Sequence, residues 1–187
     1  MVLYCNHLEC VRVYRKVMVK RTSLAGAECP VARSLDAIGD WWSLLIVRDA
    51  FDGVRRFGEF QKSLGVAKNI LAARLKALVA DGVLESVPAS DGSAYQEYAL
   101  TAKGRGLFPV VVGLRQWGEE YLFARSEPHS VLIDSVLGKP VRRLELRSQD
   151  GRLLGSDDAV VKKVTSSAAR ARHPPAHPLA ARKKPGA

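Results

Sequence analysis

The chain has 187 residues, of which 47% are hydrophobic, and a formal net charge of +10. This length fits one domain with appendages. The sequence contains no stretch of about 18 consecutive apolar residues, which a membrane span would need. Glu9 and several arginines interrupt the region where a secretion signal would be apolar, and an odd number of cysteines, three, fits a disulfide framework poorly. We therefore expect a cytoplasmic protein without a membrane partner.

The positive charge is concentrated at the two ends of the chain. Residues 162–187 hold seven Lys or Arg and no acid, residues 1–28 hold five basic and two acidic residues, and residues 29–161 are neutral overall. Within residues 55–105, however, eight basic residues meet five acidic ones. A local positive surplus of this kind favours a nucleic-acid partner.

Residues 1–26 have no clear apolar period and are expected to form an N-terminal extension, in which Met18 is a plausible alternative start. Cys5, His7 and Cys10 resemble half of a metal site, but a zinc site needs about four ligands and no second Cys/His pair follows, so we expect no metal. Residues 162–187, rich in Ala, Pro, Arg and Lys, predict a disordered basic tail.

Two helices are predicted at the start of the main domain, which we place at residues 27–125. Pro30 opens the first helix at a position that suits proline. Asp40 is a suitable N-cap for the second helix, expected from Trp41 to Phe51. The stripe of the first helix that is expected to be buried consists of Val31, Leu35 and Ile38.

Residues 57–83 predict two further helices joined by a tight turn at Leu64-Gly65-Val66. Apolar residues of the second of these helices recur at offsets that place them on one buried face: Leu71, Leu75, Leu78 and Val79. Two helices joined by a short turn containing Gly form a helix-turn-helix, whose second helix can enter the major groove of DNA.

The opposite face of this second helix is small and polar, and it is the predicted recognition surface. Asn can form paired hydrogen bonds with adenine, and Lys with guanine. Lys68, and the two arginines that precede the first helix of the helix-turn-helix, can reach phosphates. Arg74 lies beside the apolar stripe and can extend from the edge of the core to the DNA backbone. The alternative interpretation is a solvated helix face. The predicted DNA-binding residues are Arg55, Arg56, Lys68, Asn69, Ala72, Ala73, Arg74 and Lys76.

After Gly82 the apolar period changes to two, which predicts strands at residues 83–87 and 95–100 joined by a hairpin turn. A hairpin that directly follows a recognition helix is a wing. Its predicted tip consists of Ser90, Asp91, Gly92 and Ser93.

A long helix is expected over residues 102–124, capped by Thr101 and bent near Pro109. Its apolar stripe is wider than one small domain needs, which favours a dimer contact. Alternating runs in residues 126–161 predict a small β-rich appendage of two or three strands. The predicted fold class is therefore mainly α (α+β), a winged helix-turn-helix with a long C-terminal dimerisation helix.

Several motifs resemble, in order and spacing, those of the HxlR-type winged-helix transcriptional regulators, which are relatives of the MarR regulators. The motifs are Cys29 to Asp49, Arg56-Phe-Gly-Glu-Phe60, Leu71-x-x-Arg74-Leu-Lys-x-Leu78, Asp81-Gly82, Tyr98-x-Leu-Thr101-x-x-Gly104 and Trp117-Gly118. The resemblance covers about Cys29 to Phe123. It implies a bacterial homodimer, joined through residues 29–38 and 102–124, that binds a pseudo-palindromic operator.

The resemblance also places Cys29 at the family's N-terminal cysteine, which in some members senses oxidants or electrophiles. A thiol at a helix start can be reactive, and the alternative is a small buried cysteine at a dimer contact. The sequence departs from the family pattern in two places. The wing tip lacks the usual Arg or Lys, and residues 66–69 lack the usual Ser cap before the recognition helix.

We expect a sequence-specific DNA-binding regulator that responds to an effector or to redox state and needs no cofactor. The alternative is a winged-helix module for protein or ligand binding, whose basic tails give only non-specific attraction to nucleic acid. An enzyme is disfavoured because no acid/base pair, nucleophile triad or metal set can be assembled.

Overall fold

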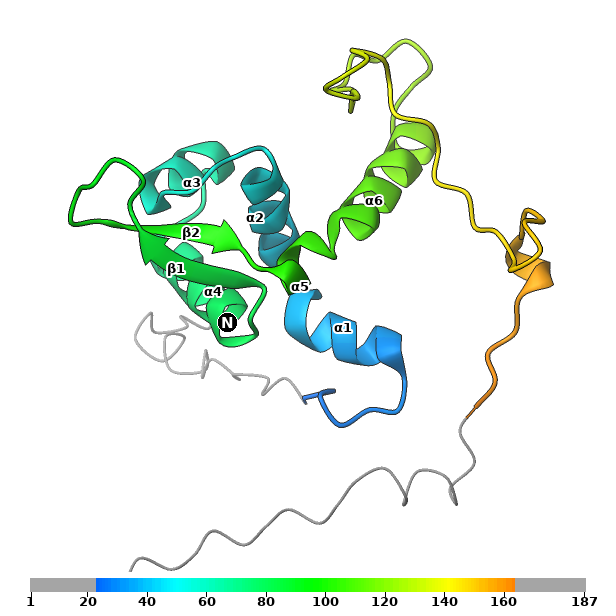
Figure 1. Ribbon diagram of the computed structural model, residues 1–187, viewed down its shortest axis with the longest axis horizontal. Coiled ribbons are helices and arrows are strands. Elements are labelled where there is room, and N and C mark those ends of the chain that lie inside the picture. The colour runs from blue at the N-terminus through cyan, green and yellow to red at the C-terminus, as the bar shows by residue number, and fades with distance from the viewer. Residues whose placement is uncertain (1–22, 164–187) are drawn as a thin grey trace, which may run out of the picture. The chain divides into compact units, whose positions relative to one another are not determined.

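The computed structural model describes residues 23–163 (Figure 1). Two compact units make up the chain, with the boundary between Ala99 and Leu100, and each is described by itself. The predictions for Cys5, His7, Cys10 and Met18, and for the tail beyond residue 163, concern residues outside the described range.

The first unit contains the four predicted helices: α1 (Pro30–Ile38), α2 (Trp41–Phe51), α3 (Phe57–Leu64) and α4 (Lys68–Ala80). Pro30 is the first residue of α1, where its missing N–H costs nothing. Asp40 caps α2, because its carboxylate accepts a hydrogen bond from the Ser43 N–H at 3.0 Å. The start and stop signals in the sequence thus determine these helix bounds. The prediction of a buried stripe on α1 is wrong for two of its three residues, because Ile38 is buried whereas Val31 and Leu35 are exposed.

The core of this unit lies where α2, α3 and α4 pack together. The fully buried side chains that fill it are Ile46, Val47, Phe60, Leu71, Leu75 and Leu78. The predicted stripe of α4 is therefore confirmed, although Val79 is only half-buried. Burial of this stripe fixes the rotation of α4, so its other face points outward.

The predicted wing follows α4 directly. Gly82, with a φ of 66°, ends the helix and lets the Val83 N–H bond to the Leu78 carbonyl at 2.9 Å. Strands β1 (Leu84–Pro88) and β2 (Gln96–Leu100) then pair in a two-stranded sheet. The Tyr98 N–H also donates to the Arg55 carbonyl at 2.8 Å, which ties β2 to the residues before α3.

In the second unit, the single helix predicted over residues 102–124 is divided into α5 (Ala102–Arg105) and α6 (Phe108–Tyr121). Thr101 caps α5 as predicted, through a 3.1 Å bond from the Gly104 N–H. Pro109 has no N–H to donate, and its ring clashes with the carbonyl four residues earlier, so the chain breaks at Gly106–Leu107 instead of bending.

The predicted β-rich appendage over residues 126–161 forms no continuous strand. Its backbone pairing consists of two isolated bridges, Ile133–Pro140 and Arg147–Leu153, followed by the short 3₁₀ helix η1 (Ser156–Asp158). No residue of this segment is buried, so no sheet face is covered, and uncovered hairpins are only marginally stable.

None of the helices within residues 23–163 has the length and apolar character needed to cross a bilayer.

Replacement of Leu75 by Ala should lower the free energy of unfolding by about 2–5 kcal/mol, because it opens a cavity in a fully buried site. Urea denaturation followed by circular dichroism measures this change. Lys76→Ala, one residue further on the exposed face, should change the free energy by less than about 0.5 kcal/mol. Equal effects of the two substitutions would contradict the assigned rotation of α4.

Candidate nucleic-acid interface

The turn between α3 and α4 presents the start of α4 to solvent. Gly65 adopts a left-handed conformation with a φ of 61°, which ends α3 without the steric cost that a Cβ would bring. Val66 is buried and anchors the turn. Ala67 occupies the N-cap of α4 and no side chain caps this helix, as the missing Ser had suggested. The first backbone N–H groups of α4 therefore remain available to an anion.

The outward face of α4 contains five of the eight predicted DNA-binding residues. All five are exposed: Lys68, Asn69, Ala72, Ala73 and Lys76. Ala72 and Ala73 make the middle of this face shallow, so a partner surface can approach the helix backbone closely. No ion pair involves Lys68 or Lys76 within the described residues, and both cations are available to a ligand.

Arg74 is placed differently from these residues. It is half-buried, and its Nε lies 3.1 Å from Asp40 Oδ1. The same Asp40 carboxylate caps α2. Arg74 therefore joins the recognition helix to the start of α2, and its charge is already balanced within the first unit.

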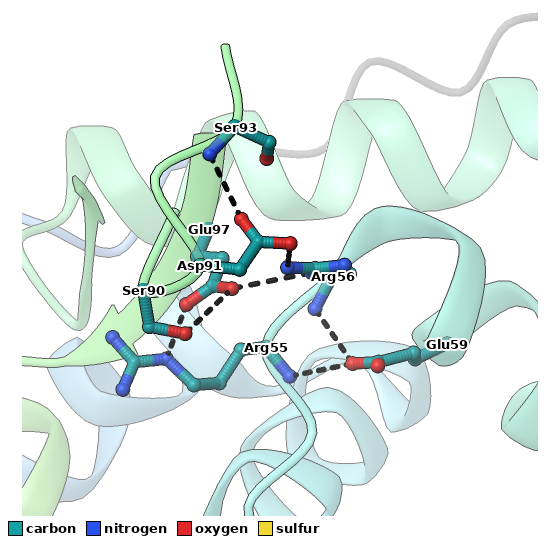
Figure 2. A network of polar contacts seen from close by, with 7 residues as sticks. All are labelled: Arg55, Arg56, Glu59, Ser90, Asp91, Ser93 and Glu97. Carbon is teal, nitrogen blue, oxygen red and sulfur yellow. Dashed lines mark hydrogen bonds and ion pairs between the residues drawn. The ribbon is translucent and has the colours of Figure 1, made fainter. Parts of the chain in front are cut away.

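The other two predicted arginines belong to a polar network between α3 and the wing (Figure 2). At its centre is Glu97 of β2, whose side chain is only 3% exposed. Arg55 Nε lies 3.0 Å from Glu97 Oε2, and Arg56 Nε lies 3.2 Å from Glu97 Oε1. The Ser90 hydroxyl also donates to Glu97, at 3.2 Å. A buried carboxylate needs such partners, so Arg55 and Arg56 both stabilise the buried charge of Glu97.

The wing tip adds a second carboxylate to this network. Asp91 Oδ2 lies 2.5 Å from Arg56 Nη2, and Asp91 Oδ1 accepts a 3.0 Å hydrogen bond from the Ser93 N–H. The pKa of the Asp91 carboxyl is held well below its ordinary value by the adjacent Ser93 hydroxyl, and then by the Arg56 guanidinium and the Ser93 N–H. Asp91 is therefore ionised at neutral pH, and the wing tip is acidic.

Glu59 occupies the start of α3. Its carboxylate accepts hydrogen bonds from the backbone N–H groups of Arg56 and Arg55, at 3.0 and 3.2 Å, and these bonds lower its pKa. The first turn of α3 thus carries a negative charge at its positive end, whereas the first turn of α4 has no acidic residue.

An open hollow of about 560 Å³ lies between α3 and the wing. It is lined by Arg56, Phe57, Gly58, Glu59, Lys62, Tyr95 and Gln96. Lys62 and Tyr95 were not among the predicted site residues, because neither belongs to the outward face of α4. The only signal for Tyr95 was its place beside the predicted wing tip.

Cys29 is exposed and occupies the N-cap position of α1. The exposure of Cys29 is that of a single chain, so both the reactive thiol and the cysteine buried at a dimer contact stay predictions.

The arrangement of α2, α3 and α4 with a hairpin directly after the outward-facing helix defines a winged helix-turn-helix protein. The model of the HxlR-like helix-turn-helix family matches residues 37–126. This chain belongs to that family.

Two named relatives illustrate the match. Rv3095 of Mycobacterium tuberculosis, an uncharacterized HTH-type transcriptional regulator, is 48% identical over 92 residues, which are 49% of this chain and 58% of the relative. The chain thus spans less than two thirds of that protein's length. YdeP of Bacillus subtilis, also an uncharacterized HTH-type transcriptional regulator, is 34% identical over 108 residues, which are 57% of this chain and 84% of YdeP.

Two solved structures of candidate transcription factors are also similar. PA1607 is 59% identical with a TM-score of 0.73, and the match covers 76% of this chain and all of that one. PA1374 of Pseudomonas aeruginosa is 39% identical with a TM-score of 0.51, covering 74% of this chain and 94% of that one.

Loss of the Ser93 hydroxyl or of the Arg56 guanidinium should raise the pKa of Asp91 toward the ordinary value of about 3.9. Because the pKa is lowered in the folded state, the network's stabilisation is present above the ordinary value and is lost as the pH falls through the folded value. Carboxyl-carbon NMR titrations of Ser93→Ala and Arg56→Met measure the shift. Glu59 is the internal control, since its pKa is lowered mainly by backbone donors. An Asp91 pKa that stays low in both variants would refute this origin.

Proposed function

We propose that this protein is a sequence-specific DNA-binding transcriptional regulator that acts as a homodimer on a pseudo-palindromic operator. The observation that carries the proposal is the outward face of α4, which combines exposed Asn69, two small alanines and two lysines that form no ion pair with the described residues 23–163. In a helix-turn-helix, this is the face that meets base edges in the major groove.

Affinity and sequence readout fall on different residues of this face. Lys68 stands at the uncapped start of α4, where its ammonium and the free N–H groups together suit a phosphate. Asn69 and Lys76 lie on the side that offers hydrogen bonds to bases. Arg55, Arg56 and Arg74 remain proposed phosphate contacts, but each must share its guanidinium with a carboxylate of its own chain.

The homodimer is proposed through residues 29–38 and 102–124. On α6, the exposed fractions of Leu114, Trp117 and Tyr121 are 50%, 54% and 63%, and on α1 Val31 and Leu35 are also exposed. Large apolar side chains left in solvent on successive helical turns indicate a protein contact. A two-fold dimer would present two recognition helices to the two half-sites of an operator.

The hollow between α3 and the wing is the observation that favours the second candidate, a module for ligand or protein binding. Its lining mixes the cations of Arg56 and Lys62 with the exposed ring of Tyr95. Removal of residues 162–187 separates the candidates, since only the second predicts loss of all DNA binding. The proposed thiol response at Cys29 rests on its exposure at the start of α1.

Asn69→Ala should weaken binding to the best operator by about 1–3 kcal/mol and relax the preference at one base pair in each half-site. Lys68→Ala should instead weaken binding to all duplexes about equally and reduce the salt dependence by about one phosphate contact. Selection from random duplexes, followed by titrations at several salt concentrations, measures both effects. Absence of any preferred sequence for the wild type would overturn the proposal.

Asp91→Asn should strengthen binding to any duplex and steepen the salt dependence, because it removes an acid from the wing tip. It also frees Arg56 Nη2 for a phosphate, while Arg56 Nε stays paired with Glu97. The steepening expected for one added contact is about 0.9 in the slope of log affinity against log salt concentration. Glu85→Gln, which removes an exposed acid from β1 of the same hairpin, is the matched control. Identical gains in both variants would mean that only net charge matters.

A further inference from the structure

Residues 126–163, here called the arm, expose an unusual amount of apolar side chain. None of these residues is buried, and ten large apolar side chains among them are at least 40% exposed, including Val136, Leu137 and Leu146. Figure 1 shows most of the arm as an extended chain without regular helices or strands. A segment with this composition and no core of its own needs a surface to cover it.

The arm is nevertheless held in a defined position on α6. The Gln116 side-chain amide forms two hydrogen bonds with the backbone of the arm. Its Oε1 accepts from the Leu144 N–H at 2.8 Å, and its Nε2 donates to the Arg142 carbonyl at 3.0 Å. Arg143 forms an ion pair with Glu120. Arg115 Nη1 donates to the Ser130 carbonyl at 2.8 Å. These contacts fix the backbone and leave the apolar side chains outside.

The exposed stripe of α6 is directly next to the stripe that holds the arm. Arg115, Gln116 and Glu120 hold the arm. Leu114 precedes Arg115 by one residue, and Trp117 and Tyr121 follow Gln116 and Glu120 by one residue each, or about 100° around the helix. The second unit therefore presents one composite apolar surface, made of the α6 stripe and the arm.

We propose that a second copy of this chain covers this composite surface, so that the arm is a clasp of the homodimer. This inference rests on the homodimer of the proposed function. A stable interface needs about 20–30 residues from each partner, and one stripe of a 14-residue helix supplies only a few. Since the arm continues that same surface, the copy that covers the stripe also meets the arm.

The comparisons agree with a clasp that is additional to the family core. Residues 37–126, matched by the family model, make up less than half of the chain. The match to PA1607 covers 76% of the 187 residues, which is about 142 residues and exceeds the 126 residues that end with the family match. That alignment therefore extends into the arm, so PA1607 carries a corresponding segment.

The test is the dimer dissociation constant of the full chain, measured by sedimentation velocity over a wide range of concentrations. Leu137→Asp/Leu146→Asp should raise this constant at least tenfold, since it places two charges in the covered surface. Ser135→Asp/Gln149→Asp, which adds the same charge at exposed polar positions of the arm, should change it less than twofold. Circular dichroism spectra of both variants should match that of the wild type, because neither alters a residue that is buried within a single chain.

Leu114→Asp separates this proposal from the homodimer itself. If Leu114→Asp dissociates the dimer while the arm variant matches the wild type, another partner or none covers the arm, and the clasp is wrong although the dimer stands. A wild type that is monomeric at all concentrations overturns both. As a second readout, amide exchange of residues 141–147 in the wild type should slow as dimer forms, and exchange independent of concentration would overturn the clasp.

Discussion

The structure of the first unit depends on the apolar contact that α4 makes with α2 and α3. Leu71, Leu75 and Leu78 are fully buried against a core that includes Ile46 and Phe60, and a helix held along one stripe cannot rotate without exposing it. Every property of the outward face follows from this contact. Asn69, Ala72, Ala73 and Lys76 are presented to a partner because the opposite side of the helix is committed to the core.

A second constraint comes from carboxylates that hold the arginines around this face. Asp40 holds Arg74, and Glu97 and Asp91 hold Arg55 and Arg56. Three of the predicted cations are thus tied to the fold, while Lys68 and Lys76 are the members of the predicted set that are not paired within residues 23–163. The surface that meets DNA in our proposal is accordingly less positive than the sequence count for residues 55–105 suggests, and its positive charge is concentrated at the two ends of one helix face.

Local patterns were sufficient to predict α1 to α4 and the wing, because each begins or ends at a residue whose backbone preference is strong, such as Pro30, Asp40 and Gly82. The ion pairs were not predictable in this way, since Arg56 and Glu97 are 41 positions apart and meet only after the hairpin folds back. The break before α6 depends on whether Pro109 bends or ends a helix, which spacing does not decide. In the arm, the alternation of apolar and polar residues predicted strands, but such a pattern produces a stable sheet only where the apolar face of the sheet is covered.

The buried position of Glu97 has a consequence for how sequences of this family vary. Because two guanidinium groups converge on one carboxylate that is 3% exposed, positions 55, 56 and 97 cannot drift independently. A neutral residue at 97 releases the Arg55 guanidinium and leaves Arg56 paired with Asp91. An apolar residue at 55 or 56 leaves the Glu97 carboxylate short of a partner. We therefore expect residues 55, 56 and 97 to covary among relatives. A single codon change at position 97 can then alter the overall affinity of such a regulator for DNA, while the residues on α4 that read the bases stay the same.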